Sequence, residues 1–303
     1  MLCVQAKAQQ EYQVSHNMFN HAVVNPGSLG SSDAVCITGL IRQQWVGFKD
    51  KEGNNVAPET FIFSADAPIN LLHGGIGFAI YQDKLGFEKN IDLKIGYAYR
   101  TVAGAGDLGI GLNISMLNQS RDFSKYIPPD GKTGDPVLGE KGKESEMILD
   151  GGLGIYYQVP NGFYAGLSAS QLLGTEGKTT AYKGVRHYYL TGGYPMTIPG
   201  HPAYEVIPSV FVKTDGTTAQ YDINAMLKYN NKVWGGLTYR VQDAVVIFLG
   251  LTIKDLQIGY SYDLTTSKIL GAGTSGSHEI MLRYCFGLEI EKHPRSYKNT
   301  RYL

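Results

Sequence analysis

The amino-acid sequence predicts an all-β fold, a transmembrane antiparallel up-and-down β-barrel of about 14 strands. Polar and apolar residues alternate with a period of two through most of the chain, and the links between these segments alternate between tight and long. The 303 residues include 38 Gly and 21 Tyr, only 18% are charged, and the formal net charge is zero. Soluble domains carry about 25% charged residues, whereas a membrane strand needs an apolar face toward lipid.

Residues 91–100 show the alternation. Their apolar side chains take the odd positions and their charged side chains the even positions, so one face suits lipid and the other water. The same pattern places strands at residues 35–46, 59–68, 75–83, 88–102, 107–122, 147–159, 162–172, 186–197, 204–214, 219–230, 233–242, 244–254, 256–266 and 277–287. No run of about eighteen apolar residues occurs, so no transmembrane helix is expected.

The links between the predicted strands differ in length. Tight links at residues 103–106, 160–162, 230–232 and 254–255 are rich in the Gly and Asn that turns favour, and links at residues 47–58, 124–146, 174–185 and 267–277 are longer. In outer-membrane barrels the short turns lie in the periplasm and the long loops outside. An even number of strands then returns the chain to the side where it started, so we expect both termini in the periplasm.

Closure of the sheet brings the first strand beside the last, because an open edge in lipid leaves backbone groups unpaired at several kcal/mol each. The register places Cys36 and Cys285 on the lumen side of these two strands, near their periplasmic ends. A disulfide across this seam is one hypothesis, and two small buried thiols are the alternative. Their separation in the sequence fits neither a zinc site nor a redox CxxC motif.

Aromatic and charged residues predict what faces lipid and what faces the lumen. Aromatic girdles at the two lipid interfaces are expected from Tyr81, Tyr97, Tyr99, Tyr156, Tyr157, Tyr188, Tyr189, Tyr260, Tyr262 and Trp45, with packing in a soluble β-core as the alternative. The charged side chains expected in the lumen are Arg42, Lys94, Arg100, Arg240, Lys254, Asp263, Glu279 and Arg283. Charged side chains of both signs more often stabilise a barrel interior than form a catalytic site.

No motif in the sequence indicates catalysis. Gly104, Gly106 and Gly109 match the G-x-G-x-x-G spacing of a dinucleotide-binding loop, but the residues that follow alternate like a strand, so we interpret the glycines as a turn. His73-Gly74-Gly75 has no accompanying G-x-S-x-G nucleophile elbow. The balanced charge argues against nucleic acid as a partner. We therefore predict a protein that is not an enzyme, with no cofactor and no metal.

The chain divides into four parts. Residues 1–8 end in an A-x-A pattern and are interpreted as the remnant of a signal peptide, with a chance match in a frayed terminus as the alternative. Residues 9–33 are expected to form a periplasmic N-terminal segment that either plugs the lumen or docks a partner. The barrel spans residues 34–287. Residues 288–303 follow as a basic periplasmic tail; for each terminal segment, an ordinary flexible terminus is the alternative.

Several stretches resemble the PorP/SprF family, over essentially the full length. They are Met18-Phe19-Asn20, Asn25-Pro26-Gly27 with Gly30, the RQQWVGF block from Arg42 to Phe48, Pro58-Glu59-Thr60, Asp66-Ala67-Pro68, Gly276-Ser277-His278-Glu279 and the closing Asn299-Thr300-Arg301-Tyr302-Leu303. The RQQWVGF block is the most specific of them. One departure is Gly27, where alanine would be usual.

This resemblance implies an outer-membrane component of the type IX secretion system, in some species tied to gliding motility. It implies contacts with a periplasmic ring lipoprotein, a peptidoglycan-binding protein and an exported surface protein that carries a C-terminal targeting domain. We expect a substrate carrier, anchor or scaffold, with a passive porin or small-solute transporter as the alternative. Residues expected at partner contacts are Met18, Phe19, Asn25, Pro26, Trp45, Phe48, Lys292, Arg295, Arg301, Tyr302 and Leu303.

Overall fold

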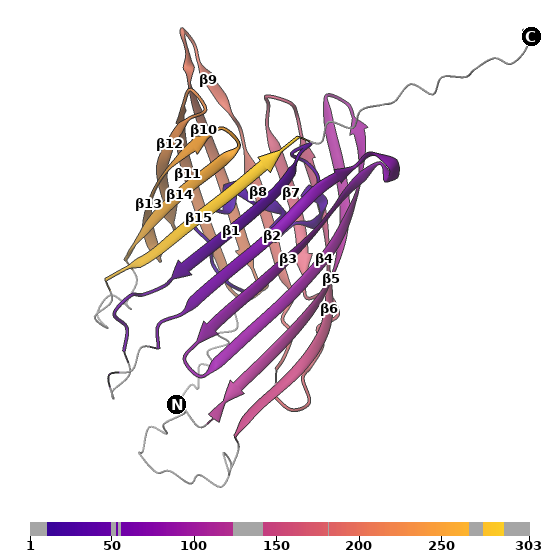
Figure 1. The fold of residues 1–303 in the computed structure, drawn as a ribbon, viewed down its shortest axis with the longest axis vertical. Coiled ribbons are helices and arrows are strands. Elements are labelled where there is room, and N and C mark those ends of the chain that lie inside the picture. Colours follow the sequence, from indigo (N-terminus) through magenta and orange to yellow (C-terminus); the bar gives the residue numbers. More distant parts are fainter. Residues whose placement is uncertain are drawn as a thin grey trace, which may run out of the picture.

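The computed structural model describes residues 11–49, 53, 56–123, 142–180, 182–266 and 275–287, which include a closed antiparallel barrel of 14 strands (Figure 1). The strands are β1 (Val35–Gln43), β2 (Glu59–Ile69), β3 (Gly74–Leu85), β4 (Glu88–Ala103), β5 (Gly106–Asp122), β6 (Lys143–Gln158), β7 (Tyr164–Ser170), β8 (His187–Gly193), β9 (Met196–Ile198), β10 (His201–Thr214), β11 (Ala219–Tyr229), β12 (Val233–Arg240), β13 (Ala244–Ile253), β14 (Leu256–Thr265) and β15 (Ser277–Phe286). The predicted fold class is confirmed.

Two of these elements, β8 and β9, are parts of a single barrel strand. Both pair with β10: β8 lies against its second half and β9 against its first. Pro195 stands between them and has no backbone N–H to donate, so the ladder is interrupted there. The predicted strand at 186–197 therefore corresponds to one strand with a break.

The barrel closes where β1 pairs with β15, in a register that runs from Val35 opposite Phe286 to Gln43 opposite His278. This pairing joins the first and last strands, so neither presents an open edge to lipid at the seam. Cys36 and Cys285 face each other in the register and form a disulfide with an S–S distance of 2.13 Å. The covalent link thus lies on the closing seam of the barrel.

The outer face of the barrel is apolar. Large aliphatic side chains such as Ile95, Leu167 and Leu249 are more than half exposed, and their strand neighbours turn inward. A soluble monomer rarely exposes more than a few hundred Å² of contiguous apolar surface, so this band requires lipid around it. Within the described ranges, no helix has the length and apolar character to cross a membrane.

Three of the tyrosines assigned to lipid girdles lie in the lumen instead. Tyr81, Tyr156 and Tyr189 are buried, whereas Tyr99 and Tyr188 are exposed on the outer face. Successive residues of a strand point to opposite faces, so of the neighbours Tyr188 and Tyr189 only one can reach lipid. The girdle prediction was wrong for the three inward residues because their own strand parity was not applied.

The connections define two ends of the barrel, the turn end and the loop end. At the turn end, uppermost in Figure 1, lie the links β2–β3 with η4 (Asn70–Leu72), β4–β5, β6–β7, β9–β10, β11–β12 and β13–β14. The loop end is where the strands meet the links 44–58, 86–87, 123–142, 171–186, 215–218, 241–243 and 266–276. Four of these seven links are long, as predicted from the sequence. The other three are tight, namely 86–87, 215–218 and 241–243. Lys254, expected in the lumen, lies exposed in the β13–β14 turn.

The seam disulfide gives a first testable prediction. Because the bond closes a loop of 249 residues, its loss should lower the free energy of unfolding by about 2–5 kcal/mol. Unreduced, denatured protein should migrate faster on electrophoresis than reduced protein, and Cys36→Ser and Cys285→Ser should both migrate like the reduced form. Free reaction of both thiols with a maleimide in unreduced, denatured protein would show that the bond is absent.

Candidate functional site

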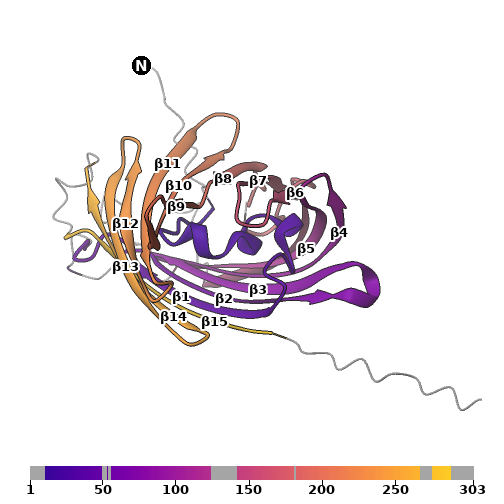
Figure 2. The same ribbon diagram turned by 90° about the horizontal axis from the view of Figure 1, so that it is seen from above.

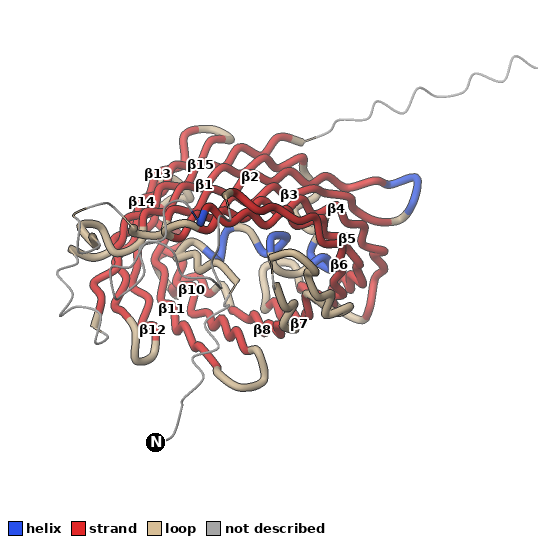
Figure 3. The backbone as a smooth tube through the Cα atoms, turned by 90° about the horizontal axis from the view of Figure 1, so that it is seen from below, coloured by secondary structure: helices blue, strands red, loops and turns tan. Residues whose placement is uncertain are grey.

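The lumen is filled by the chain's own N-terminal segment. Residues 11–34 run through the barrel and contain three short 3-10 helices, η1 (Asn17–Phe19), η2 (His21–Val23) and η3 (Pro26–Ser28). Seen along the barrel, these helices lie inside the ring of strands (Figures 2 and 3). We call residues 11–34 the plug. The described part of the predicted periplasmic segment 9–33 thus lies within the barrel. It is held there because its polar groups bond to the lumen wall.

The plug is held most firmly at Glu279. This carboxylate accepts the backbone N–H groups of Ser15 and His16, both at 2.8 Å, and its Oε1 lies 2.6 Å from the ring Nδ1 of His16. Arg42 also donates to it, at 3.3 Å. A carboxylate that binds successive backbone N–H groups is strongly held, since charge-assisted hydrogen bonds exceed neutral ones in strength.

A second carboxylate, Asp263, extends this network. It accepts from Arg42 at 2.7 Å, from Arg240 at 2.8 Å and from the Ser15 hydroxyl at 2.9 Å. Arg240 in turn pairs with Asp222 at 3.2 Å. We call these seven residues, Ser15, His16, Arg42, Asp222, Arg240, Asp263 and Glu279, the lumen clasp. All are 2% exposed or less, so deleting a charged member leaves its buried partners with less compensation of their charge.

The clasp lies on strands at or near the closing seam. Arg42 on β1 and Glu279 on β15 are register partners across the seam, while Asp263 is on β14 and Arg240 on β12. The same side chains thus connect the first and last strands and hold the plug. Seating of the plug and closure of the barrel are therefore linked.

Apolar contacts fix the rest of the plug. Phe19 packs on Trp234, with ring centroids 4.3 Å apart, in a buried cluster that includes Phe248. Tyr12 stacks on Tyr81 at 4.4 Å, in a second cluster. The aromatic wall residues of the two clusters lie on β3, β12 and β13. The plug and the barrel wall therefore form hydrophobic contacts on opposite sides of the lumen.

Glycines of the wall receive the plug backbone. A Cβ atom added at Gly75 would lie 2.3 Å from the carbonyl oxygen of Leu29, and one at Gly109 would lie 2.1 Å from that of Gly27. Gly111 is as close to Pro26, at 2.3 Å. Real Cβ contacts are not this short, so only glycine permits the approach. These lumen-facing glycines account for part of the glycine content that the sequence displays.

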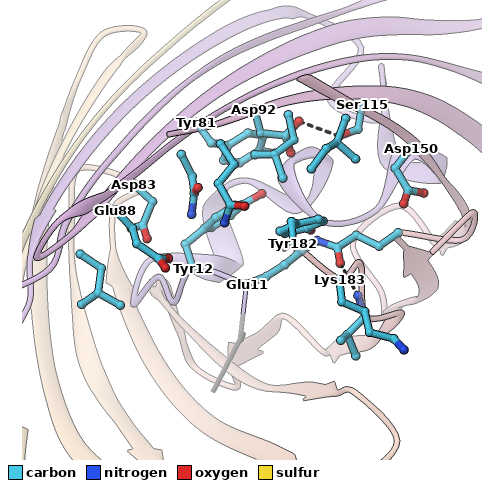
Figure 4. Close-up of a pocket in the computed structure, with 17 residues that line it drawn as sticks. Glu11, Tyr12, Tyr81, Asp83, Glu88, Asp92, Ser115, Asp150, Tyr182 and Lys183 are labelled. Carbon is cyan, nitrogen blue, oxygen red and sulfur yellow. Dashed lines mark hydrogen bonds between the residues drawn. The ribbon is translucent and has the colours of Figure 1, made fainter. Parts of the chain in front are cut away.

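A cavity of about 130 Å³ remains at the loop end of the lumen, and we call it the loop-end cavity (Figure 4). Its lining includes Tyr12 and Glu11 of the plug, carboxylates of β3, β4 and β6, and residues of the β7–β8 link. A second cavity of about 250 Å³ lies toward the turn end, between the plug and β15, and includes Met18, Phe19 and Arg283 in its lining.

The structure separates the residues predicted to contact partners into three groups. Met18, Phe19, Asn25 and Pro26 lie inside the barrel, where they contact the wall or line the turn-end cavity. Trp45 and Phe48 lie together in the β1–β2 loop, with ring centroids 6.4 Å apart. Lys292, Arg295, Arg301, Tyr302 and Leu303 lie outside the described residues.

Sequence reasoning found part of the clasp and missed the rest. Strand parity correctly turned Arg42, Arg240, Asp263 and Glu279 into the lumen. Ser15 and His16 belong to a segment without periodicity, so nothing in the sequence pointed to their contacts. Among the described residues, no group of three or more His, Cys, Asp or Glu could hold a metal ion.

The fold and the site define a class of protein, a transmembrane β-barrel whose lumen is plugged by its own N-terminal segment. The family model of the type IX secretion system membrane protein PorP/SprF matches residues 6–284. The chain belongs to this family, and it is an outer-membrane component of type IX secretion. No curated protein sequence matches the chain.

Several solved structures are similar to the chain over most of its length. Omp33 of Acinetobacter baumannii is 8% identical, with a TM-score of 0.48 over 84% of this chain and 98% of that chain. The monoaromatic hydrocarbon channel CymD is 12% identical, with a TM-score of 0.49 over 88% and 92%. The P. putida toluene transporter TodX is 10% identical, with a TM-score of 0.49 over 88% and 94%.

Removing the Glu279 carboxylate should release the plug. In Glu279→Ala, two plug N–H groups and Arg42 lose their acceptor, a loss of about 3–5 kcal/mol for a broken buried pair. In planar bilayers, the wild-type chain should show no steady conductance, and Glu279→Ala should show channel openings.

The matched control for this prediction is Asp107→Ala, whose carboxylate pairs with Arg100 near the turn end. It should stay closed, as the wild type does. Steady conductance of the wild type, or closed barrels in correctly inserted Glu279→Ala, would contradict the role assigned to the clasp.

Proposed function

We propose that this protein acts in type IX secretion as a non-conducting carrier or anchor that links exported surface proteins to the periplasmic machinery. The observation that carries the proposal is the filled lumen. Buried ionic, aromatic and glycine contacts all hold the plug in place, and such a lumen favours a scaffold over a passive porin. Family and fold also favour a non-enzymatic role.

Under this proposal, the two ends of the barrel face different compartments. Long links gather at the loop end, as on the outer side of bacterial barrels, so the loop end would face the cell exterior. The turn end would then face the periplasm. Glu11, the first residue of the plug, would lie toward the outer mouth, unlike the periplasmic position expected for the N-terminal segment. Since β15 ends at Phe286 at the turn end, the tail 288–303 would begin on the periplasmic side.

Partners follow from this orientation. The exported surface protein, with its C-terminal targeting domain, would meet the loop end, where Trp45 and Phe48 offer an aromatic pair. Buried aromatic anchors commonly dominate protein interfaces. The ring lipoprotein and the peptidoglycan-binding protein would meet the turn end and the tail.

Affinity isolation from gently solubilised outer membranes tests this arrangement. Truncating both loop-end aromatics, in Trp45→Ala with Phe48→Ala, should reduce recovery of the exported protein about tenfold or more, because hot-spot truncation costs about 2 kcal/mol or more. Recovery of the periplasmic partners should not change. Truncation after Gly287 should reduce recovery of the periplasmic partners, leave recovery of the exported protein unchanged and leave the barrel inserted.

The matched control is Phe163→Ala, which removes an exposed aromatic side chain at the turn end. It should leave recovery of the exported protein at the wild-type level. If neither loop-end substitution nor tail truncation alters any co-purified protein, the carrier proposal fails.

A further inference from the structure

We propose that the loop-end cavity is a binding site for an organic cation, a primary ammonium or guanidinium group. The group could come from a lysine or arginine side chain of a peptide or from a free polyamine. The site differs from the lumen clasp, since its lining shares no side chain with the clasp. The inference stands independently of the carrier role.

Five carboxylates line the wall of the cavity. Glu11, Asp83, Glu88, Asp92 and Asp150 all belong to the lining, and Figure 4 shows them around one space, from the plug, β3, β4 and β6. Such a concentration of one charge sign inside low-dielectric walls attracts ions of the opposite sign.

Only part of this charge is neutralised by the protein. Lys94 lies 3.9 Å from Glu11 and 3.7 Å from Asp92, and Arg121 lies 2.8 Å from Glu88. Asp83 and Asp150 have uncharged partners instead among the described residues: Asp83 accepts from the Thr60 hydroxyl, and Asp150 from two backbone N–H groups. Two carboxylates on the wall therefore lack a cation.

Lys183, the cation in the lining, forms an ion pair outside the cavity lining. Its ammonium lies 3.2 Å from Glu176, and its side chain is 73% exposed to solvent. Its charge is directed to Glu176 and solvent, so the Asp83 and Asp150 carboxylates remain available to a cation from outside.

Independent evidence for a ligand comes from Gln119 on β5. Its side chain lines the cavity, it is 1% exposed, and its carbonyl oxygen has no hydrogen-bond partner among the described residues. The carbonyl oxygen of Asn90, also in the lining, is likewise without a partner. Buried acceptors are almost always satisfied in proteins, so the two amides call for a ligand that donates hydrogen bonds.

Two aromatic rings of the lining already contact a cation of the protein. The Lys94 ammonium lies 4.8 Å from the ring centre of Tyr81 and 5.6 Å from that of Tyr12, both within cation–π range. Tyr182 provides a further ring in the lining. A cavity of about 130 Å³ is close to the roughly 150 Å³ that accommodates benzene, so it suits one side-chain head group.

The test measures binding to the detergent-solubilised full chain by titration calorimetry. The probes are N-acetyl-lysine amide and N-acetyl-norleucine amide, which share a linear side chain but differ in the ammonium group, together with spermidine and a lysine-containing tetrapeptide. We expect saturable binding of the lysine probe, weakened about tenfold or more by Asp83→Asn with Asp150→Asn, because both carboxylates lose their charge. Raised salt should weaken binding to a smaller extent, since buried charge pairs are screened less than exposed ones.

Gln119→Leu keeps a side chain of similar size but removes the unpaired acceptor, so it should also weaken binding of the lysine probe. It serves as the second variant if the double variant fails to fold. The control is Asp215→Asn, a loop-end carboxylate that caps its own turn and lies outside the cavity lining. Tighter binding of the tetrapeptide or of spermidine identifies the source of the cation. Equal binding of the norleucine probe, or unchanged binding in both folded cavity variants, would overturn the proposal.

Discussion

The structure depends on how the buried carboxylate of Glu279 is satisfied. Alternation along β15 sends this side chain into the lumen, where a charged group without partners would be costly. Arg42 on the neighbouring strand supplies one partner, and the plug supplies two backbone N–H groups and the ring of His16. The barrel alone therefore leaves this group incompletely bonded, and the plug completes its coordination.

Several other features of the molecule follow from the plug. Lumen-facing glycines give the plug backbone its space, and lumen-facing aromatics such as Trp234 and Tyr81 pack against its side chains. The protein thus has an apolar outer surface for lipid and an inner core formed with its own N-terminal segment. A barrel built in this way has a lumen that its own chain occupies.

The barrel could be predicted from the sequence because each strand carries its own period of two. The same parity correctly placed Arg42 and Glu279 in the lumen and set Cys36 opposite Cys285. The plug contacts could not be predicted, since Ser15 and Glu279 are separated by 264 residues and the plug has no periodicity. Tyr81 and Tyr189 were assigned to lipid because residue type was weighed above strand parity. The role of the lumen-facing glycines becomes clear only from their contacts with the plug.

Hydrogen–deuterium exchange of the purified, detergent-solubilised chain tests the central claim most directly. Backbone N–H groups of the plug, such as those of Ser15, His16 and Asn25, are hydrogen-bonded inside the lumen. Peptides covering residues 13–29 should therefore exchange as slowly as those from the neighbouring strands β1 and β15. Exchange of these peptides within seconds, while the strands remain protected, would show that the segment leaves the lumen freely and would contradict the account.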